Sequence, residues 1–168
     1  MSIKGKIFNI IPITVYQEKV YTQDVIVELN NGLKIAISDP SKYCKKEYIN
    51  KIKNLKIKIF LASLTEKVDN CEIQISPAFS EKEPYQGPIA NICGRIEQIV
   101  DVELGDVEHS YSILDVGVGT IKILYKDTRG LNLLEKNIDN LLVQKKSIFI
   151  KGAYIKIKGA TLYLEGIE

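Results

Sequence analysis

Residues 25–37, VIVELNNGLKIAI, decide the fold because their apolar side chains alternate instead of following a helical period. The first part predicts a strand whose apolar face consists of Val25, Val27 and Leu29. Asn30-Asn31-Gly32 is a strong turn signal, and the alternation resumes directly after it. The stretch therefore predicts a β-hairpin with one buried face.

The rest of the first half continues the alternation with one interruption. Asp39-Pro40-Ser41 is a turn and N-cap signal, and we expect residues 43–54 after it to be helical. Residues 55–61, LKIKIFL, alternate again and predict a strand, and a last strand is expected at 71–75. The first half thus predicts the order strand, strand, strand, helix, strand, strand.

The second half repeats this order after a connector. Residues 77–88 hold three prolines and a glycine between charged residues, which is typical of a linker. Beyond it, Ile92-Cys93-Gly94-Arg95-Ile96 echoes Ile3-Lys4-Gly5-Lys6-Ile7, and a second helix is expected at 131–142. The repeated order predicts an all-β chain with one short helix per module. Its parts are a basic module at 1–80, a connector at 81–90, and a module with an acidic first loop at 91–168.

This plan resembles the OB-fold domains of replication protein A and the archaeal single-stranded-DNA-binding proteins. The resemblance is carried by Ile92-x-Gly94-Arg95-Ile96 and by the segments 116–123, 146–156 and 162–164, with a weaker match through Gly5, Gly32 and the strand from Leu55. It implies two tandem five-stranded Greek-key barrels, with 162–164 as the fifth strand of the second. One larger β-barrel or sandwich is the alternative.

Composition limits the function. The chain has 23 basic and 21 acidic residues, and a net charge of +2 argues against a protein that coats a polyanion by charge alone. The longest apolar runs are too short to span a membrane and no signal peptide is evident, so we expect a cytoplasmic protein with no membrane contact. The three cysteines, Cys44, Cys71 and Cys93, are spaced too widely for a metal knuckle and are expected to be free thiols.

No motif predicts catalysis or metal binding. The single histidine, His109, lies in an acidic run at 101–110 that is more typical of a solvated loop than of a metal site. Gly117-Val118-Gly119 precedes a strand, whereas a phosphate-binding loop precedes a helix. No G-x-S-x-G segment occurs. We therefore expect no enzymatic activity, no cofactor, no metal and no small-molecule substrate.

Binding of single-stranded nucleic acid requires cations for the phosphates and aromatic rings for the bases. The outward positions of the predicted strands supply both kinds of side chain: Lys4, Lys6, Phe8, Lys34, Lys56, Lys58, Phe60, Arg95, Tyr111, Lys122 and Phe149. Lysines at such positions also serve simply to keep exposed strands from aggregating. The leading hypothesis is a non-enzymatic protein that binds single-stranded nucleic acid, DNA in preference to RNA.

The two predicted modules differ in charge. Residues 1–85 contain 13 basic and 10 acidic residues, whereas the remainder contains 10 and 11. Residues 101–115 hold five acids without a lysine or arginine, and the outward Ile113 and Leu124 are apolar. The second hypothesis is therefore an assembly module of a replication, repair or RNA-processing complex, whose second module contacts a protein partner or another copy of the chain.

Overall fold

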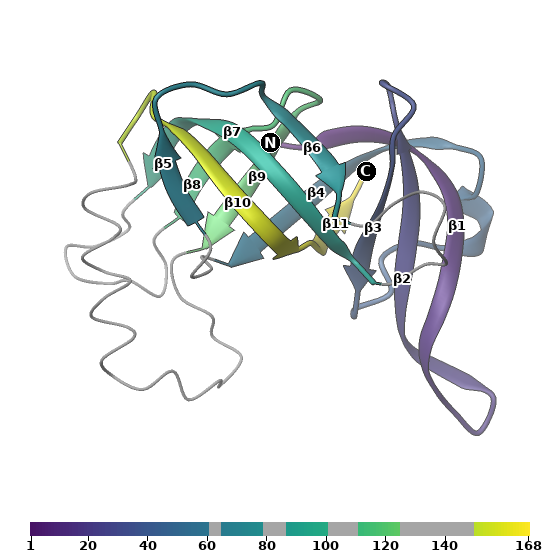
Figure 1. Cartoon of the computed structure of the whole chain (residues 1–168). Helices are drawn as coiled ribbons and strands as arrows, with labels where there is room; N and C mark the ends of the chain where they lie inside the picture. Colours follow the sequence, from purple (N-terminus) through teal and green to yellow (C-terminus); the bar gives the residue numbers. More distant parts are fainter. Residues whose placement is uncertain (61–64, 79–86, 101–110, 125–149) are drawn as a thin grey trace, which may run out of the picture.

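The computed structural model describes residues 1–60, 65–78, 87–100, 111–124 and 150–168, and these form an all-β protein, as the alternation predicted. Figure 1 shows the arrangement. The strands are β1 (Ile3–Tyr16), β2 (Lys19–Leu29), β3 (Lys34–Asp39), β4 (Ile52–Phe60), β5 (Thr65–Val68), β6 (Gln74–Pro77), β7 (Ile89–Val100), β8 (Tyr111–Asp115), β9 (Thr120–Leu124), β10 (Tyr154–Thr161) and β11 (Tyr163–Ile167).

The predicted inward face of the first hairpin is confirmed. Val25, Val27 and Leu29 on β2 are at most 3% exposed, and so are Ile35 and Ile37 on β3. The turn between the two strands uses Gly32 with a φ of 83°, a conformation that glycine adopts without steric cost. These side chains belong to one isoleucine-rich core that includes residues from both halves of the chain.

Five strands close into a barrel. β1 pairs antiparallel with both β2 and β4, and β2 pairs antiparallel with β3. β11 closes the ring because it pairs parallel with β3, through Tyr163 and Ser38, and antiparallel with β4. The final strand was expected to complete the sheet of the second half, and that expectation is wrong. It completes the ring formed by the strands of the first half.

The other strands continue the same sheet. Residues 58–60 of β4 pair parallel with β9, which joins the antiparallel series β9, β8 and β7. β10 lies between β7 and β5, and β6 pairs with the first part of β7. β4 is therefore the strand that connects the barrel to the strands of the second half (Figure 1).

Two glycines hold corresponding positions in the two halves. Gly5 on β1 and Gly94 on β7 are both buried. A Cβ on Gly94 would lie 2.6 Å from the carbonyl oxygen of Asp115 and 2.6 Å from Cγ of Leu114, and a Cβ on Gly5 would collide with Val27. A side chain would force the neighbouring strand away in both places. The repeated glycine in the sequence thus has a packing reason.

The helix predicted at 43–54 is wrong. That stretch contains only a 3₁₀ turn, η1 (Lys46–Tyr48), and β4 already begins at Ile52. Asn50 has a φ of 68°, which no right-handed helix can accommodate. The second predicted helix, at 131–142, lies outside the described residues. Among those that are described, no helix has the length and apolar character to cross a membrane.

Asp39, at the end of β3, explains why this stretch is a loop. Its carboxylate is fully buried and accepts backbone hydrogen bonds from Tyr43 at 2.9 Å and from Cys44 at 2.9 Å. It also accepts a bond from the side-chain amide of Gln23 at 2.8 Å. The predicted turn at this aspartate is therefore real, but its side chain fixes the loop that follows and does not start a helix.

A disulfide bond joins Cys71 to Cys93. Cys71 lies just before β6, and β6 runs antiparallel to β7 with Gln74 opposite Cys93, so the ladder brings the two cysteines together. The prediction of free thiols is therefore wrong for Cys71 and Cys93, because spacing along the chain could not show this contact. Cys44 is a free and buried thiol.

Candidate nucleic-acid interface

One face of the sheet carries lysines and aromatic rings from both halves of the chain. On β4, Lys58 lies opposite Tyr163 of β11 on one side and opposite Lys122 of β9 on the other. Lys122 in turn lies opposite Ile113 of β8. All four side chains are partly exposed and their sequence neighbours are buried, so they share the outward face. They form a row across four adjacent strands.

A second row lies beside the first. Phe60 on β4 is the partner of Leu124 on β9, which is the partner of Tyr111 on β8. The rings of Phe60 and Tyr163 meet edge to face, with their centroids 5.4 Å apart. The two rows together are called the seam face here, because they cross the junction between β4 and β9. The seam face consists of Lys58, Phe60, Tyr111, Ile113, Lys122, Leu124 and Tyr163.

The two lysines of the seam face lie near aromatic rings. Nζ of Lys58 is 5.9 Å from the ring centroid of Phe60, and Nζ of Lys122 is 4.6 Å from that of Tyr111. Lys122 also forms an ion pair with Glu165 on β11 at 3.2 Å, which offsets part of its charge. Lys58 has no ion pair within the described part of the chain. Lys58 is therefore the stronger candidate for a phosphate contact.

A second group of predicted residues lies on the first three strands. Lys6, Glu28 and Lys34 form a row across β1, β2 and β3, and Nζ of Lys34 is 4.0 Å from the ring centroid of Phe8. The predicted exposure of Lys4, Lys6, Phe8 and Lys34 is confirmed. Glu28 lies between the two lysines of the row and reduces the positive potential there. This group is a weaker candidate for binding phosphate than the seam face.

Lys56 lies on the same outward side of β4 as Lys58 but is bound to an acid. Its Nζ forms an ion pair with Glu168 at 2.8 Å. The hydrogen bond in this pair raises the pKa of Lys56 and lowers the pKa of Glu168. Both side chains are exposed, so the pair is screened by water and contributes little to stability. Glu168 would compete with a phosphate for this lysine.

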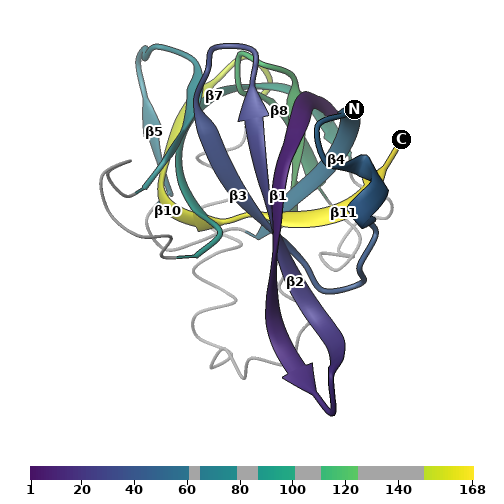
Figure 2. The same ribbon diagram turned by 90° about the vertical axis from the view of Figure 1, so that its right-hand side faces the viewer.

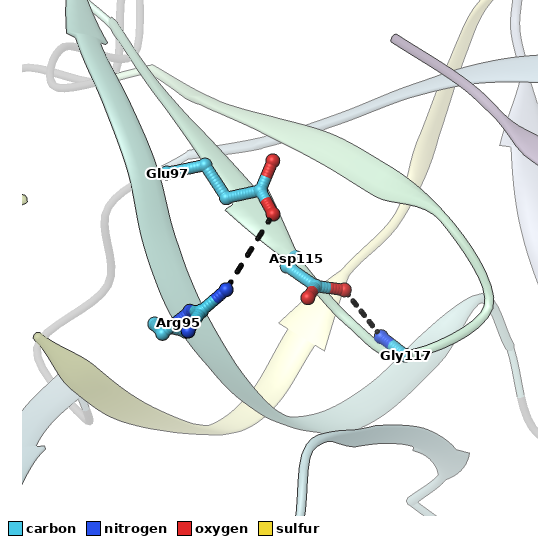
Figure 3. A network of polar contacts seen from close by, with 4 residues as sticks. All are labelled: Arg95, Glu97, Asp115 and Gly117. Carbon is cyan, nitrogen blue, oxygen red and sulfur yellow. Dashed lines mark hydrogen bonds and ion pairs between the residues drawn. The ribbon is translucent and has the colours of Figure 1, made fainter. Parts of the chain in front are cut away.

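Arg95 lies among carboxylates. It is opposite Asp115 in the ladder between β7 and β8, and its guanidinium lies 4.0 Å from the carboxylate of Glu97. Figure 3 shows these side chains together, with Asp115 accepting a hydrogen bond from the backbone N–H of Gly117 at 2.9 Å. The two acids make Arg95 a poor phosphate ligand. Phe149 and the acidic run with His109 lie outside the described residues.

Sequence reasoning missed one residue of the seam face and one beside it. Tyr163 adds a ring and Glu165 holds Lys122, and both lie on β11. Their alternation with the buried Leu164 was the only available signal. In the part of the chain that is described, no group of three or more histidine, cysteine, aspartate or glutamate side chains could hold a metal ion.

No protein-family model matches the chain, and comparison with curated proteins and with solved structures gives no match.

Proposed function

We propose that this chain is a non-enzymatic protein that binds single-stranded nucleic acid through the seam face. The supporting observation is that Lys58 and Lys122 lie side by side among the rings of Phe60, Tyr111 and Tyr163. Cations that hold the phosphates and rings that stack on the bases are the two features that such binding requires. Partial exposure leaves these side chains accessible to a ligand.

We further propose that the chain consists of two OB-fold-like barrels that exchange their last strands. The closed ring has five strands, and its fifth strand, β11, comes from the second half. The pairing among β7, β8, β9 and β10 follows the order of the pairing among β1, β2, β3 and β4. β4 together with β5 takes the place of a fifth strand in this second set, because β9 pairs with β4 and β10 pairs with β5. In this proposal the modules at 1–80 and 91–168 interlock, and the seam face belongs to both.

Fluorescence anisotropy with a labelled oligo-dT in about 50 mM salt tests the function, because phosphate contacts are strong at low salt. Lys58→Glu should weaken binding roughly tenfold, since a repulsive charge replaces a phosphate contact. Lys156→Glu is the matched control, because Lys156 is exposed on β10, which lies in front of β4 and β9 in Figure 1. Absence of binding by the unmodified chain, or equal losses in both variants, would contradict the proposal.

Protein assembly is the second candidate function. Ile113 and Leu124 add partly exposed apolar area to the seam face, and such area at the centre of a patch suits a protein contact. A pull-down with the Ile113→Asp variant separates the two functions. Loss of a partner with unchanged oligonucleotide binding would favour assembly.

The cytoplasmic location expected from the sequence stays a prediction. The Cys71–Cys93 bond counts against it, because stable disulfides are rare in reducing compartments. Trapping free thiols with an alkylating reagent at the moment of cell lysis would show whether the bond exists in the cell. Alkylation of both Cys71 and Cys93 would show that they are reduced in the cell and would support a cytoplasmic location.

A further inference from the structure

The hairpin of β1 and β2 continues beyond the barrel as a two-stranded arm, residues 9–22 (Figure 2). β4 accompanies β1 only along residues 3–6, and β3 accompanies β2 only from Gln23 onward. Among the residues that the structure describes, no further strand pairs with the arm. Gln17 and Glu18 form its turn with φ values of 50° and 64°. The arm thus extends to its tip without a neighbour among the described strands.

The arm exposes large apolar and aromatic side chains. Ile13 is 51% exposed, Val15 54%, Tyr16 64% and Tyr21 45%. Its two charged residues, Glu18 and Lys19, have opposite signs, so the arm has no net charge to attract a charged partner. A two-stranded hairpin by itself is marginally stable in water. A further strand that covers the apolar side chains would stabilise it.

We propose that the arm pairs with the arm of a second copy of this chain, through the outer edges of the two β1 strands. On the outer edge of β2, the carbonyl of Val20 already accepts a hydrogen bond from Nζ of Lys42 at 2.8 Å. Pro12 lacks an N–H group and therefore interrupts a new ladder on the barrel side. Residues 13–16 of β1 remain as the edge that can accept another strand.

The sequence of this edge is self-complementary. A two-fold axis through Val15 would place this residue opposite its own copy and Thr14 of one copy opposite Tyr16 of the other, on both sides of the axis. A β-branched side chain opposite an aromatic ring is a favourable cross-strand pair. A second copy therefore supplies both the missing ladder and the apolar cover.

The exposed area sets the strength of the association. Each of the four half-exposed side chains offers roughly 100 Å², so two arms would bury at most on the order of 800 Å² of side-chain surface, since Tyr21 lies on β2, away from the paired edge. Stable complexes bury about 1,200 Å² or more in total. We therefore expect a weak dimer that forms at micromolar concentrations.

Sedimentation of the full chain from about 1 to about 200 µM brackets a micromolar dissociation constant. The average mass should rise from 18.9 kDa towards twice that value. Tyr16→Lys should raise the protein concentration at the midpoint of this association at least tenfold. Ile52→Lys is the matched control, because Ile52 is 63% exposed but lies on β4, and it should leave the midpoint unchanged. A monomer at every concentration, or equal shifts in both variants, would overturn the proposal.

A cross-link tests the geometry separately. Val15→Cys should form a covalent dimer on mild oxidation, since the two-fold axis brings the two copies of this position together, whereas Ile52→Cys should not. Cross-linking of both positions alike would overturn the pairing. Tyr16→Lys should keep its binding of oligo-dT, so failure of the dimer and failure of the nucleic-acid interface give different results.

Discussion

Lys58 on β4 and Lys122 on β9 are direct neighbours in a parallel ladder, although they come from different halves of the chain. Like charges at opposite positions of a sheet destabilise it. The carboxylate of Glu165 lies 3.2 Å from Nζ of Lys122 and offsets part of its charge, but it does not neutralise the neighbouring Lys58. A local arrangement that opposes stability is characteristic of a functional site, and an anionic ligand would relieve the repulsion.

The salt dependence of binding should identify the phosphate contact. We expect Lys58→Gln to lower the slope of log affinity against log salt concentration by about 0.7, the value for one phosphate contact to a single strand. Anisotropy titrations at several salt concentrations measure this slope. Lys156→Gln should leave the slope unchanged, and a slope that stays the same in Lys58→Gln would exclude a direct phosphate contact there.

Stacking on Phe60 should contribute to affinity independently of salt. Phe60→Ala should reduce binding of oligo-dT by about 1–3 kcal/mol, as expected when one base loses its aromatic partner. Phe60→Tyr should retain most of the affinity, because it keeps the ring. Tyr43→Ala is the control, because the ring of Tyr43 is 42% exposed but lies outside the seam face. If Phe60→Tyr bound as poorly as Phe60→Ala, stacking would not be the reason, and a urea unfolding curve would reveal a loss of stability instead.

The fold class and the orientation of individual side chains could be predicted from the sequence. Alternation placed Val27 and Ile35 inside the barrel and Lys34 outside, because successive side chains of a strand point to opposite faces. The pairing of distant strands could not be predicted this way. Alternation shows which side of a strand is buried, but it does not show which strand lies beside it.

The candidate site illustrates the same limit. Lys58 and Lys122 were both selected as outward lysines, yet their contact depends on the parallel pairing of β4 with β9. The neutralising acids were also hidden, since Glu165 reaches Lys122 and Glu168 reaches Lys56 only because β11 lies beside β4. Ion pairs between strands distant in sequence require a known register, and composition does not provide one.

The Cys71–Cys93 bond should stabilise the chain. A disulfide that closes a loop of this length contributes about 3 kcal/mol, because it restricts the unfolded chain. Reduction with dithiothreitol should therefore lower the urea midpoint of the unmodified protein. Cys71→Ser should unfold at the lower midpoint with or without the reductant. A reductant effect that persisted in Cys71→Ser would show that the bond is not its cause.

Stability should fall as the pH rises between about 4 and about 6 because of Asp24. Burial on β2 raises the pKa of this carboxyl from 3.8 to about 6. In that interval the folded chain binds more protons than the unfolded chain, so the stabilisation is complete below the unfolded pKa and is lost above the folded one. The loss is on the order of 1 kcal/mol after allowance for screening.

Urea unfolding at a series of pH values measures this effect. Asp24→Asn should flatten the curve across the interval, because the amide does not titrate. Asp69→Asn, at an exposed position, should leave the curve as it is in the unmodified chain. A fall of the same size in Asp24→Asn would assign the pH dependence to another group.

The position of β11 in the barrel has a consequence for synthesis on the ribosome. β1, β2, β3 and β4 can associate as soon as residue 60 has emerged. The edges of β3 and β4 that face β11, however, gain no partner among the described strands until residues 163–167 follow. During that interval the nascent chain presents two open strand edges, which are the features that cause aggregation. Translation speed and chaperone supply should therefore affect the yield of this protein more than that of a chain whose first barrel closes with its own next strand.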